Sequence, residues 1–258
     1  MIDPRTGESA TAEAEEVSFG YASVSAPEKR RLVGGQFDSI ARRYDLADAL
    51  LSFGLHFRWK RWGIDRLALK DGELALDVCG GTADLALLAS TRVVPHGFAF
   101  VYDFNRPMMR AGRVKAKRSR FAESVLFIEG DAESLSFPDA VFDAITVGFG
   151  IRNLVHLDRG LSEMHRVLKP GGRIMILEFS LPVHAWFRRL YDLYSFKVMP
   201  LGARIICGTA GPFRYLAESI RVFDPPERVV ERLKSAGFSD VRFRRLTDGI
   251  AVVYLARR

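Results

Sequence analysis

The sequence predicts a doubly wound α/β domain built on a mostly parallel sheet of seven strands. From Leu74 onward, short apolar runs alternate with segments of helical periodicity, the pattern of a parallel sheet covered by helices. One apolar run ends at Asp77 and is followed by Gly80-Gly-Thr82 and an apolar helix, a strand–turn–helix unit typical of Rossmann-like folds. With 258 residues, 48% of them hydrophobic, the chain can bury one large core.

The N-terminal third divides into two parts. Residues 1–28 contain few large apolar side chains and are expected to form a flexible or loosely attached tail. Residues 37–69 combine helical periodicity with many aromatic side chains and predict a helical extension in front of the sheet. The domain itself is expected to occupy residues 29–258.

The remaining elements follow from apolar periodicity and turn signals. Five parallel strands are expected at Leu74–Val78, Phe98–Tyr102, Ser124–Ile128, Ala144–Phe149 and Arg173–Phe179. Helices are expected at Asp84–Ser90, Pro107–Lys117, Leu157–Val167 and Val229–Ala236. Residues 182–226 form an insertion after the fifth strand, expected to act as a substrate lid. The strands Val241–Arg245 and Ile250–Ala256 are expected to pair and close the sheet.

Composition limits the classes of function. The net charge of +7 indicates attraction to an anionic partner, either nucleic acid or a membrane surface. Two cysteines, Cys79 and Cys207, cannot build a disulfide framework and have no metal-ligand spacing, so a reducing compartment and no metal are expected. No apolar run reaches the roughly 18–20 residues of a membrane span, and no secretory signal precedes the domain. A cytoplasmic location is therefore expected.

The turn Gly80-Gly81-Thr82 predicts a ligand site. Glycines let the backbone approach a ligand closely, and the helix N-terminus that follows points at it. A dinucleotide fingerprint would need glycine at position 82, and a phosphate loop would need a Gly-Lys-Ser/Thr ending; neither is present. An acid that closes the strand, here Asp77, followed by Gly-Gly-Thr resembles motif I of the S-adenosylmethionine-dependent methyltransferases.

The next strand ends agree with this interpretation, because ligands bind beyond the carboxyl ends of parallel strands. Asp103, 23 positions after Gly80, can accept both hydrogens of a ribose diol, although it could also cap the helix that follows. Asp131-Ala132 is expected to contact the adenine amino group, and Gly148 to leave room for the cofactor. Together these residues predict an S-adenosylmethionine site.

Several longer segments resemble one family, the ubiquinone/menaquinone biosynthesis C-methyltransferases. They are Phe37-Asp-Ser-Ile-Ala-Arg-Arg-Tyr-Asp45, Leu51-Ser-Phe-Gly-Leu-His-Phe-Arg-Trp-Lys60, Gly148-Phe-Gly-Ile-Arg-Asn153, Arg166-Val-Leu-Lys-Pro-Gly-Gly172, Leu177-Glu-Phe-Ser180 and Arg214-Tyr-Leu-Ala-Glu-Ser-Ile220. The resemblance implies a class I methyltransferase fold and methyl transfer from S-adenosylmethionine to a ring carbon of a polyprenylated hydroquinone. A demethylmenaquinol is favoured over a methoxy-benzoquinol.

Three residues are the catalytic candidates. Arg152 could stabilise a developing phenolate oxygen, and Asn153 could orient the ring or a water molecule. By resemblance, Tyr44 is the contribution of the N-terminal helices to the pocket. The alternatives are structural: Arg152 could cap the following turn, and Tyr44 could belong to the core. His56, beside Phe57 and Trp59, is interpreted as structural rather than as a base.

The expected partners are a polyprenylated quinol and a membrane surface. The segment His184–Pro200 interleaves aromatic residues with cations, which suits a lid that touches lipid headgroups and equally suits an amphipathic helix packed on the sheet. A basic cluster between Arg106 and Arg120 is a solvated face with weak attraction to anionic lipid. The chain lacks a nucleic-acid-binding module, so no nucleic acid is expected. A homodimer or a quinone-biosynthesis complex is left open.

The chain departs from the family pattern at three places. Ala83 replaces the usual glycine after Gly-Gly-Thr, the asparagine usual after the Tyr-Asp-Leu stretch is replaced in Leu46-Ala47-Asp48, and Gly208–Phe213 replaces a polar acidic segment. If position 83 needs a positive φ, alanine costs of order 1 kcal/mol. Two rival functions follow: a methyltransferase for another acceptor, including RNA, or a non-catalytic cofactor-binding subunit of a quinone-biosynthesis complex.

Overall fold

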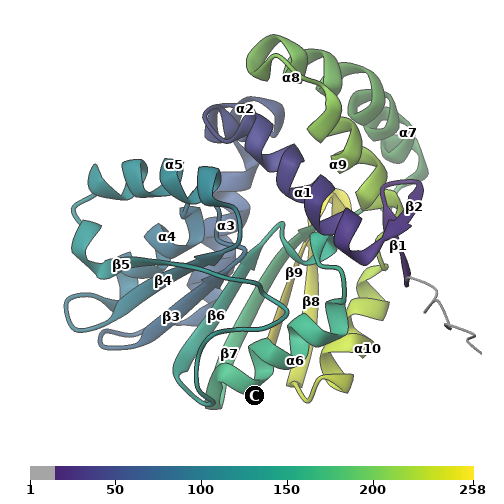
Figure 1. Cartoon of the computed structure of the whole chain (residues 1–258). Helices are drawn as coiled ribbons and strands as arrows, with labels where there is room; N and C mark the ends of the chain where they lie inside the picture. Colours follow the sequence, from purple (N-terminus) through teal and green to yellow (C-terminus); the bar gives the residue numbers. More distant parts are fainter. Residues whose placement is uncertain (1–14) are drawn as a thin grey trace, which may run out of the picture.

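A computed structural model describes residues 15–258, and it contains the seven-stranded sheet that the sequence predicts (Figure 1). The strand order is β5-β4-β3-β6-β7-β9-β8, and only β9 runs antiparallel to its neighbours. The chain reverses its direction of travel across the sheet between β3 and β6, the position where Rossmann-like folds bind ligands. The strands are β3 (Leu74–Val78), β4 (Phe98–Asp103), β5 (Val125–Glu129), β6 (Phe142–Gly148), β7 (Leu168–Phe179), β8 (Ser239–Leu246) and β9 (Ala251–Arg257).

Helices cover both faces of the sheet, as expected of a doubly wound fold. Helices α3 (Leu55–Leu67), α4 (Asp84–Val93) and α5 (Arg106–Lys117) cover one face, and α6 (Leu157–Val167) and α10 (Pro226–Ser235) cover the other (Figure 1). Helices α4, α5, α6 and α10 lie within a few residues of their predicted ranges, and α3 lies within the helical segment predicted at residues 37–69.

Alternate residues of each strand enter separate cores, because successive strand side chains point to opposite faces. Leu76 of β3 and Ile145 of β6 pack toward α6 and α10, whereas Ala75 and Ala144 pack toward α3 and α4. The central strands β3 and β6 are buried on both faces, which explains their continuous apolar runs.

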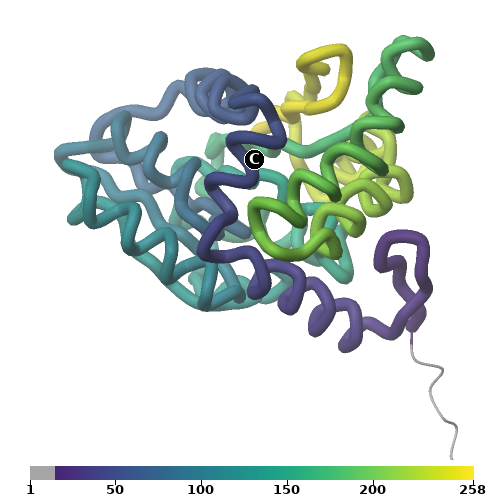
Figure 2. Tube along the Cα trace, turned by 90° about the horizontal axis from the view of Figure 1, so that it is seen from above, coloured from purple at the N-terminus to yellow at the C-terminus, as the bar shows by residue number. Residues whose placement is uncertain are grey.

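The remaining helices gather above the carboxyl ends of the strands (Figures 1 and 2). A third apolar cluster joins the N-terminal helices to the insertion through Ile40, Ala47, Met199 and Phe213. No helix within residues 15–258 has the length and apolarity to cross a membrane. The elements above the sheet are α1 (Ala26–Ile40), α2 (Tyr44–Leu51), α7 (Ala185–Leu193), a π-helical turn (Tyr194–Val198), α8 (Met199–Cys207) and α9 (Gly211–Val222).

The N-terminal segment differs from the prediction. A tail was expected through residue 28, but residues 15–28 form a hairpin of β1 (Glu16–Phe19) and β2 (Ala22–Ser25) and the start of α1. The hairpin docks on α9, where the Phe19 ring stacks on Tyr215 at 4.3 Å. This contact supplies the apolar partner that the local sequence lacks. Residues 1–14 of the expected tail lie outside the described part of the chain.

The segment Lys169–Gly172, which precedes the predicted strand Arg173–Phe179, lies inside β7 rather than in front of it. In the pairing with β6, Phe142 is opposite Leu168 and Ala144 is opposite Arg173, so residues 169–172 bulge out between two paired positions. Their outer edge is held by Arg258, whose backbone exchanges hydrogen bonds with Gly171 and Gly172. Pairing with the C-terminus therefore extends the strand beyond its apolar run.

Gly97, at the start of β4, allows a close backbone approach that positions the strand carrying Asp103. A Cβ atom on Gly97 would lie 2.3 Å from the Glu73 carbonyl oxygen and 2.6 Å from that of Val93. Gly97→Ala should therefore lower the free energy of unfolding by about 2–4 kcal/mol. Gly35→Ala is the matched control, because nothing lies within 4 Å of that position in α1, and it should raise stability by about 0.5–1 kcal/mol. Urea unfolding measures both, and equal effects would contradict the packing argument.

Candidate active site

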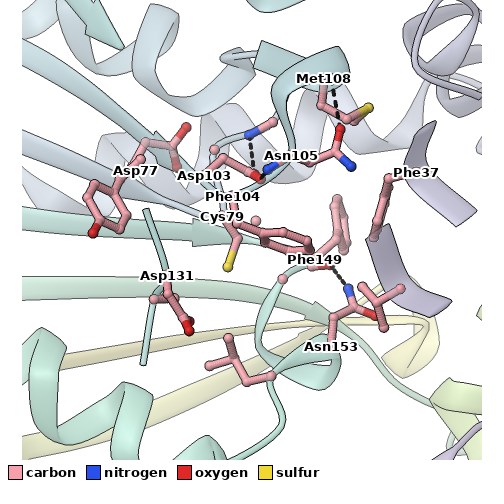
Figure 3. Close-up of a pocket in the computed structure, with 18 of the residues that line it drawn as sticks. Phe37, Asp77, Cys79, Asp103, Phe104, Asn105, Met108, Asp131, Phe149 and Asn153 are labelled. Atoms are coloured by element: carbon pink, nitrogen blue, oxygen red, sulfur yellow. Dashed lines mark hydrogen bonds between the residues drawn. The ribbon is translucent and has the colours of Figure 1, made fainter. Parts of the chain in front are cut away.

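A cavity of about 150 Å³ lies at the carboxyl ends of β3, β4, β5 and β6. Its lining includes ten of the eleven predicted site residues, and Figure 3 shows how Asp77, Asp103, Asp131 and Asn153 surround it. The ten are Tyr44, Asp77, Gly80, Gly81, Thr82, Asp103, Asp131, Ala132, Gly148 and Asn153. Arg152 is the exception.

The glycine turn after β3 has the backbone conformation of a close-approach loop. Cys79, Gly81 and Ala83 all have φ between +48° and +69°, the left-handed region that disfavours side chains. A Cβ atom on Gly80 would lie 2.8 Å from the Asp77 carbonyl oxygen, so glycine is required there. Ala83 costs about 1–2 kcal/mol in this conformation, yet it keeps the turn intact, since its N–H donates to Gly80 O at 2.8 Å.

Asp77 organises the turn from inside. It is 2% exposed, and its two carboxylate oxygens accept hydrogen bonds from Thr146 Oγ1 at 2.8 Å and from the Ala86 N–H at 3.1 Å. Burial raises the pKa of Asp77 to about 7, although these hydrogen bonds oppose the shift. The side chain thus ties β3 to β6 and to the first turn of α4.

Asp103 is the carboxylate best placed for a ligand. It ends β4, and its two oxygens accept hydrogen bonds from the Gly81 N–H at 2.9 Å and the Asn105 N–H at 2.7 Å (Figure 3). Burial raises its pKa to about 6 against the effect of these N–H groups. Each carboxylate oxygen keeps a free lone pair, so Asp103 can accept two more hydrogen bonds from a diol.

The other strand ends shape the cavity. The Asp131 carboxylate pairs with Arg30 of α1 at 2.6 Å, which connects the N-terminal helix to the end of β5. Ala132 is buried beside it. Gly148 was expected to leave room for a cofactor, but a Cβ atom there would lie 2.8 Å from Leu85 Cδ1. The missing side chain therefore admits Leu85, which itself lines the cavity.

Arg152 does not line this cavity. Its Nη1 lies 2.7 Å from Glu178 Oε1 and donates to the Phe149 carbonyl oxygen at 2.6 Å. Both side chains are almost fully buried, and the guanidinium lies 5.6 Å from the Phe179 ring centroid. The positive charge of Arg152 is therefore compensated by Glu178, which sequence reasoning did not single out.

Asn153 is held in place from two sides. Its Nδ2 donates to the Phe149 carbonyl oxygen at 3.4 Å, and its Oδ1 accepts a hydrogen bond from the Tyr215 hydroxyl at 3.0 Å. Tyr215 comes from α9 of the insertion, and burial raises its pKa to about 12. Tyr44 lines the same cavity from α2, where burial raises its pKa well above the ordinary value. The N-terminal helices therefore contribute to the cavity wall, and the insertion supports that wall through Tyr215.

A buried network of charges ties α2 to the glycine turn. Asp45 of α2 accepts from Thr82 Oγ1 at 2.6 Å and from Lys115 Nζ at 2.8 Å. Lys115 and Lys60 both bind the Asp84 carboxylate, at 2.5 and 2.7 Å. Thr82, predicted as a cofactor contact, thus uses its hydroxyl to anchor α2.

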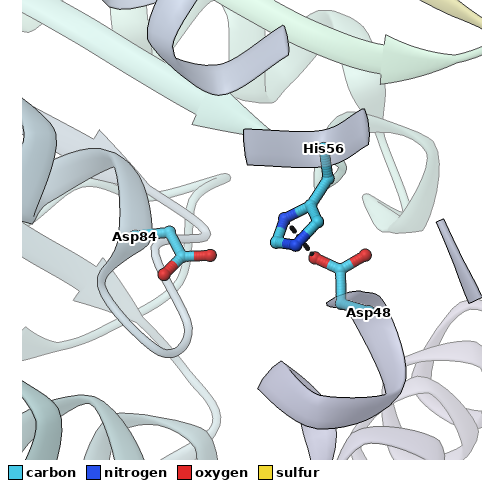
Figure 4. Close-up of side chains that lie close together, drawn as sticks. All are labelled: Asp48, His56 and Asp84. Carbon is cyan, nitrogen blue, oxygen red and sulfur yellow. Dashed lines mark ion pairs between the residues drawn. The ribbon is translucent and has the colours of Figure 1, made fainter. Parts of the chain in front are cut away.

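One part of this network has the composition of a metal site. Asp48, His56 and Asp84 bring ligand atoms within 4.8 Å of one another (Figure 4). However, Lys60 Nζ lies among them, 3.1 Å from Asp48, 2.9 Å from His56 and 2.7 Å from Asp84. The ammonium supplies the positive charge that these groups require. His56 is 1% exposed and lines neither of the two cavities described here, so its structural interpretation agrees with its position.

A second, larger cavity of about 390 Å³ lies beneath the insertion. It is separated from the first by two stacked rings 4.1 Å apart, Phe149 of the first and Phe179 of the second. Its walls are mostly apolar and come from α2, α3, the insertion and the turn before β9. They include Leu51, Phe53, Leu55, Trp59, Phe187, Leu190, Leu193, Met199, Phe213, Leu216, Ile220 and Ile250.

Comparison with known proteins assigns the family. The model of the ubiE/COQ5 methyltransferase family matches residues 24–258. The ubiquinone/menaquinone biosynthesis C-methyltransferase UbiE of Methylococcus capsulatus is 42% identical over 236 residues, covering 92% of this chain and 95% of that protein. The chain belongs to the ubiE/COQ5 methyltransferase family. A second member, UbiE of Shewanella sp. strain ANA-3, is 41% identical over 94% of this chain and 96% of its own length.

Solved structures confirm the class I methyltransferase fold of this family member. A S-adenosylmethionine-dependent methyltransferase from Thermotoga maritima superposes with a TM-score of 0.60 at 17% identity, over 87% of this chain and 99% of its own. A second such methyltransferase, from Aquifex aeolicus, superposes with a TM-score of 0.54 at 16% identity, over 91% of this chain and 98% of its own. The fold class and the family resemblance stated from the sequence are therefore both confirmed.

Sequence reasoning missed three features of the site: the second cavity, the Arg152–Glu178 pair and the charge network. Glu178 and Tyr215 both lie in segments that carry the family resemblance, which was the available signal. Asp45 and Lys60 of the network also lie in such segments, but nothing in the sequence indicates that they pair with Lys115, to which they have no periodic relation.

Asp77 should give the protein a distinctive pH dependence of stability. Its folded pKa of about 7 exceeds the value near 4 of a carboxyl in an unfolded chain. Between these values the folded protein binds a proton that the unfolded chain releases, so Asp77 increases the free energy of unfolding as the pH falls from about 7 toward 4. Asp77→Asn should remove this contribution and give a smaller gain on acidification. Urea unfolding between pH about 8 and about 5 measures it, and parallel profiles for the two proteins would contradict it.

Proposed function

We propose that this protein transfers a methyl group from S-adenosylmethionine to a ring carbon of a polyprenylated hydroquinone, with demethylmenaquinol as the favoured acceptor. One observation carries the proposal: a cavity at the carboxyl ends of the strands, lined by several carboxylates, lies beside a larger apolar cavity, and the stacked Phe149 and Phe179 rings stand between them. Family membership supports the same reaction, because the relatives are named as ubiquinone/menaquinone biosynthesis C-methyltransferases.

The cavity at the carboxyl ends of β3, β4, β5 and β6, named the donor cavity, has the groups that S-adenosylmethionine requires. Asp103 would accept the ribose hydroxyls, the turn at Gly80 and Gly81 would lie against the amino-acid end, and Asp131 with Ala132 would face the adenine. The fit is supported by Gly130, where a Cβ atom would lie 1.9 Å from the Tyr102 hydroxyl, so this part of the rim keeps a bare backbone. When bound, S-adenosylmethionine supplies an electrophilic methyl group.

The apolar cavity suits the prenyl chain and the ring. Its walls offer few hydrogen-bonding partners, so a long isoprenoid would gain burial energy there at about 25 cal/mol per Å². The ring would lie at the boundary with the donor cavity, near Tyr44 and Asn153. Catalysis then depends on holding a ring carbon in line with the methyl group, and positioning of this kind can contribute several kcal/mol.

Asn153 and Tyr44 are proposed as the residues that contact the ring, with Tyr215 as a positioning residue for Asn153. The Tyr215 hydroxyl fixes the Asn153 side chain by donating to Oδ1. Arg152 acts indirectly, because its hydrogen bond to the Phe149 carbonyl oxygen orders the loop that carries Asn153. Removal of the Arg152 side chain would also leave Glu178 buried without a cationic partner, which costs about 3–5 kcal/mol.

A paired acceptor assay tests the proposal. Purified protein is titrated calorimetrically with S-adenosylmethionine and then supplied with a short-chain demethylmenaquinol or a methoxy-benzoquinol under reducing conditions. Donor binding with methyl transfer to at least one quinol is expected. Donor binding without transfer to either would favour a non-catalytic subunit, transfer to RNA alone would favour another acceptor class, and no donor binding would overturn the proposal.

Two substitutions should separate donor binding from turnover. Asp103→Asn removes an anionic acceptor and should weaken S-adenosylmethionine binding by about 10–100-fold. Asn153→Ala leaves the strand end of β4 untouched and should lower turnover by about 10–100-fold with donor affinity within about threefold. Calorimetry and initial rates measure the two effects. The assignment of roles would be reversed if Asn153→Ala mainly weakened donor binding.

The mouth of the apolar cavity is also proposed to rest on a membrane surface. Phe53 and Ile205 are each 77% exposed and Trp186 is 69% exposed. Exposing such large apolar side chains to water is unfavourable unless an apolar phase covers them. Exposed cations accompany these side chains in the insertion: Arg188, Arg189, Lys197 and Arg204. Apolar side chains beside basic ones suit an anionic lipid headgroup region.

Vesicle flotation tests the membrane contact. The protein should float with vesicles that contain anionic lipid, and added salt should reduce the bound fraction. The double substitution Trp186→Ser and Ile205→Ser should abolish most of the binding. Val114→Ser with Leu126→Ser is the matched control, because these exposed apolar residues lie on α5 and β5, and it should bind like the wild type. Equal loss in both variants would refute a specific membrane face.

A further inference from the structure

The apolar cavity contains a single charged side chain, considering the residues of 15–258 that line it: Asp48 of α2. Its neighbours in the wall are aliphatic and aromatic, with isolated hydroxyl groups from Ser52, Thr247 and two tyrosines. A carboxylate in such a wall is costly unless it has a function or a compensating partner.

One carboxylate oxygen of Asp48 has partners in the charge network, and the other has none among the described residues. Oδ2 lies 3.1 Å from Lys60 Nζ and 2.9 Å from His56 Nδ1, and Figure 4 shows this oxygen directed at His56. Oδ1 accepts no hydrogen bond from the described residues and is not among their inaccessible unpaired atoms. Since the side chain is 12% exposed and lines the cavity, Oδ1 is available to a molecule bound there.

The network keeps Asp48 ionised. Burial alone would raise its pKa, but Lys60 and His56 outweigh burial and hold the pKa below its ordinary value. At neutral pH the side chain is therefore an acceptor only, with no proton to donate. A neighbouring atom that carries a hydrogen is attracted to Oδ1, and one that carries only lone pairs is repelled.

Tyr44, Asp48 and Ser52 follow each other at one-turn intervals, so they share one face of α2. Tyr44 lines the donor cavity, whereas Asp48 and Ser52 line the apolar one. Ser52 Oγ is buried without a hydrogen-bond partner in the described residues. This face of α2 therefore runs from the donor cavity into the acceptor cavity and presents two unsatisfied polar groups along the way.

We propose that Asp48 selects the reduced ring: its Oδ1 accepts a hydrogen bond from a hydroxyl of the hydroquinone and repels the carbonyl oxygen of the corresponding quinone. This inference rests on the proposed function and adds a determinant of redox specificity to it. Only the reduced ring is electron-rich enough to attack a methyl donor, so selection against the quinone prevents an unproductive complex from occupying the cavity.

Selection of this kind belongs to the residue present here. The family resemblance leads one to expect an asparagine within the stretch Leu46-Ala47-Asp48, and an amide offers both a donor and an acceptor. An amide can turn either group toward the ring and satisfy either redox form. Asp48→Asn is therefore the sharpest test, because it changes one donor–acceptor pattern at nearly constant shape.

The experiment measures the affinity of a short-chain demethylmenaquinol and of its quinone for protein saturated with S-adenosylhomocysteine, without oxygen. The wild type should bind the quinol about 10–100-fold more tightly, and Asp48→Asn should reduce that ratio to within about threefold. Asp48→Glu retains the charge and should retain discrimination. Asp65→Asn is the control, since it removes an exposed carboxylate from α3 that lines neither cavity, and it should leave the ratio unchanged.

The outcomes separate the two proposals. If the wild type methylates the quinol but binds both redox forms equally, the selection by Asp48 is wrong and the proposed function stands. The same conclusion follows if Asp48→Asn folds, binds S-adenosylhomocysteine normally and still discriminates. Should Asp48→Asn not fold, the wild-type ratio and the Asp48→Glu ratio decide. If the wild type binds and methylates neither quinol, the proposed function fails first.

Discussion

The arrangement of the site depends on the buried ion-pair network between α2 and the glycine turn. Lys115 and Lys60 both contact Asp84 at the start of α4. On α2, Asp45 pairs with Lys115 and Asp48 pairs with Lys60. These pairs hold α2 over the carboxyl ends of the strands, as the Arg30–Asp131 pair holds α1. Lys60 is almost fully buried, so removing one of its acidic partners would leave its charge less compensated. The network fixes the distance between the donor turn and the helix that faces the acceptor.

Backbone strain accumulates at the same place. Cys79, Ala83 and Phe149 adopt left-handed conformations, which cost of order 1–3 kcal/mol each, and all three surround the donor cavity or lie beside it. Asp77 offsets part of this cost by holding β3, β6 and α4 together. The strain at Phe149 has a geometric result: the ring packs against Phe179 and forms the partition between the two cavities.

The fold was largely predictable because its signals are local. Apolar strands such as those ending at Asp77 and Asp103 are buried on both faces, so their sequences identify them without tertiary information. The hairpin at residues 15–25 was not predictable, since its stabilising contact, the Phe19–Tyr215 stack, joins opposite ends of the chain. The orientation of Arg152 was invisible for the same reason: its partner Glu178 lies on the neighbouring strand, β7. Strand-end chemistry could be read from the sequence, but long-range pairing of charges could not.

The charges around the cavities lead to one further step. Arg152 is neutralised by Glu178, so in the proposed reaction the charge that develops on a ring oxygen would be stabilised by the dipoles of Asn153 and the tyrosine hydroxyls. The network beside the donor turn pairs two ammonium groups, Lys60 and Lys115, with three carboxylates, Asp45, Asp48 and Asp84, which leaves one net negative charge. A negative field favours binding of a cationic methyl donor. This advantage is lost once methyl transfer has removed the positive charge of the sulfur. The same groups that hold α2 in place therefore also favour binding of the substrate donor over its uncharged product.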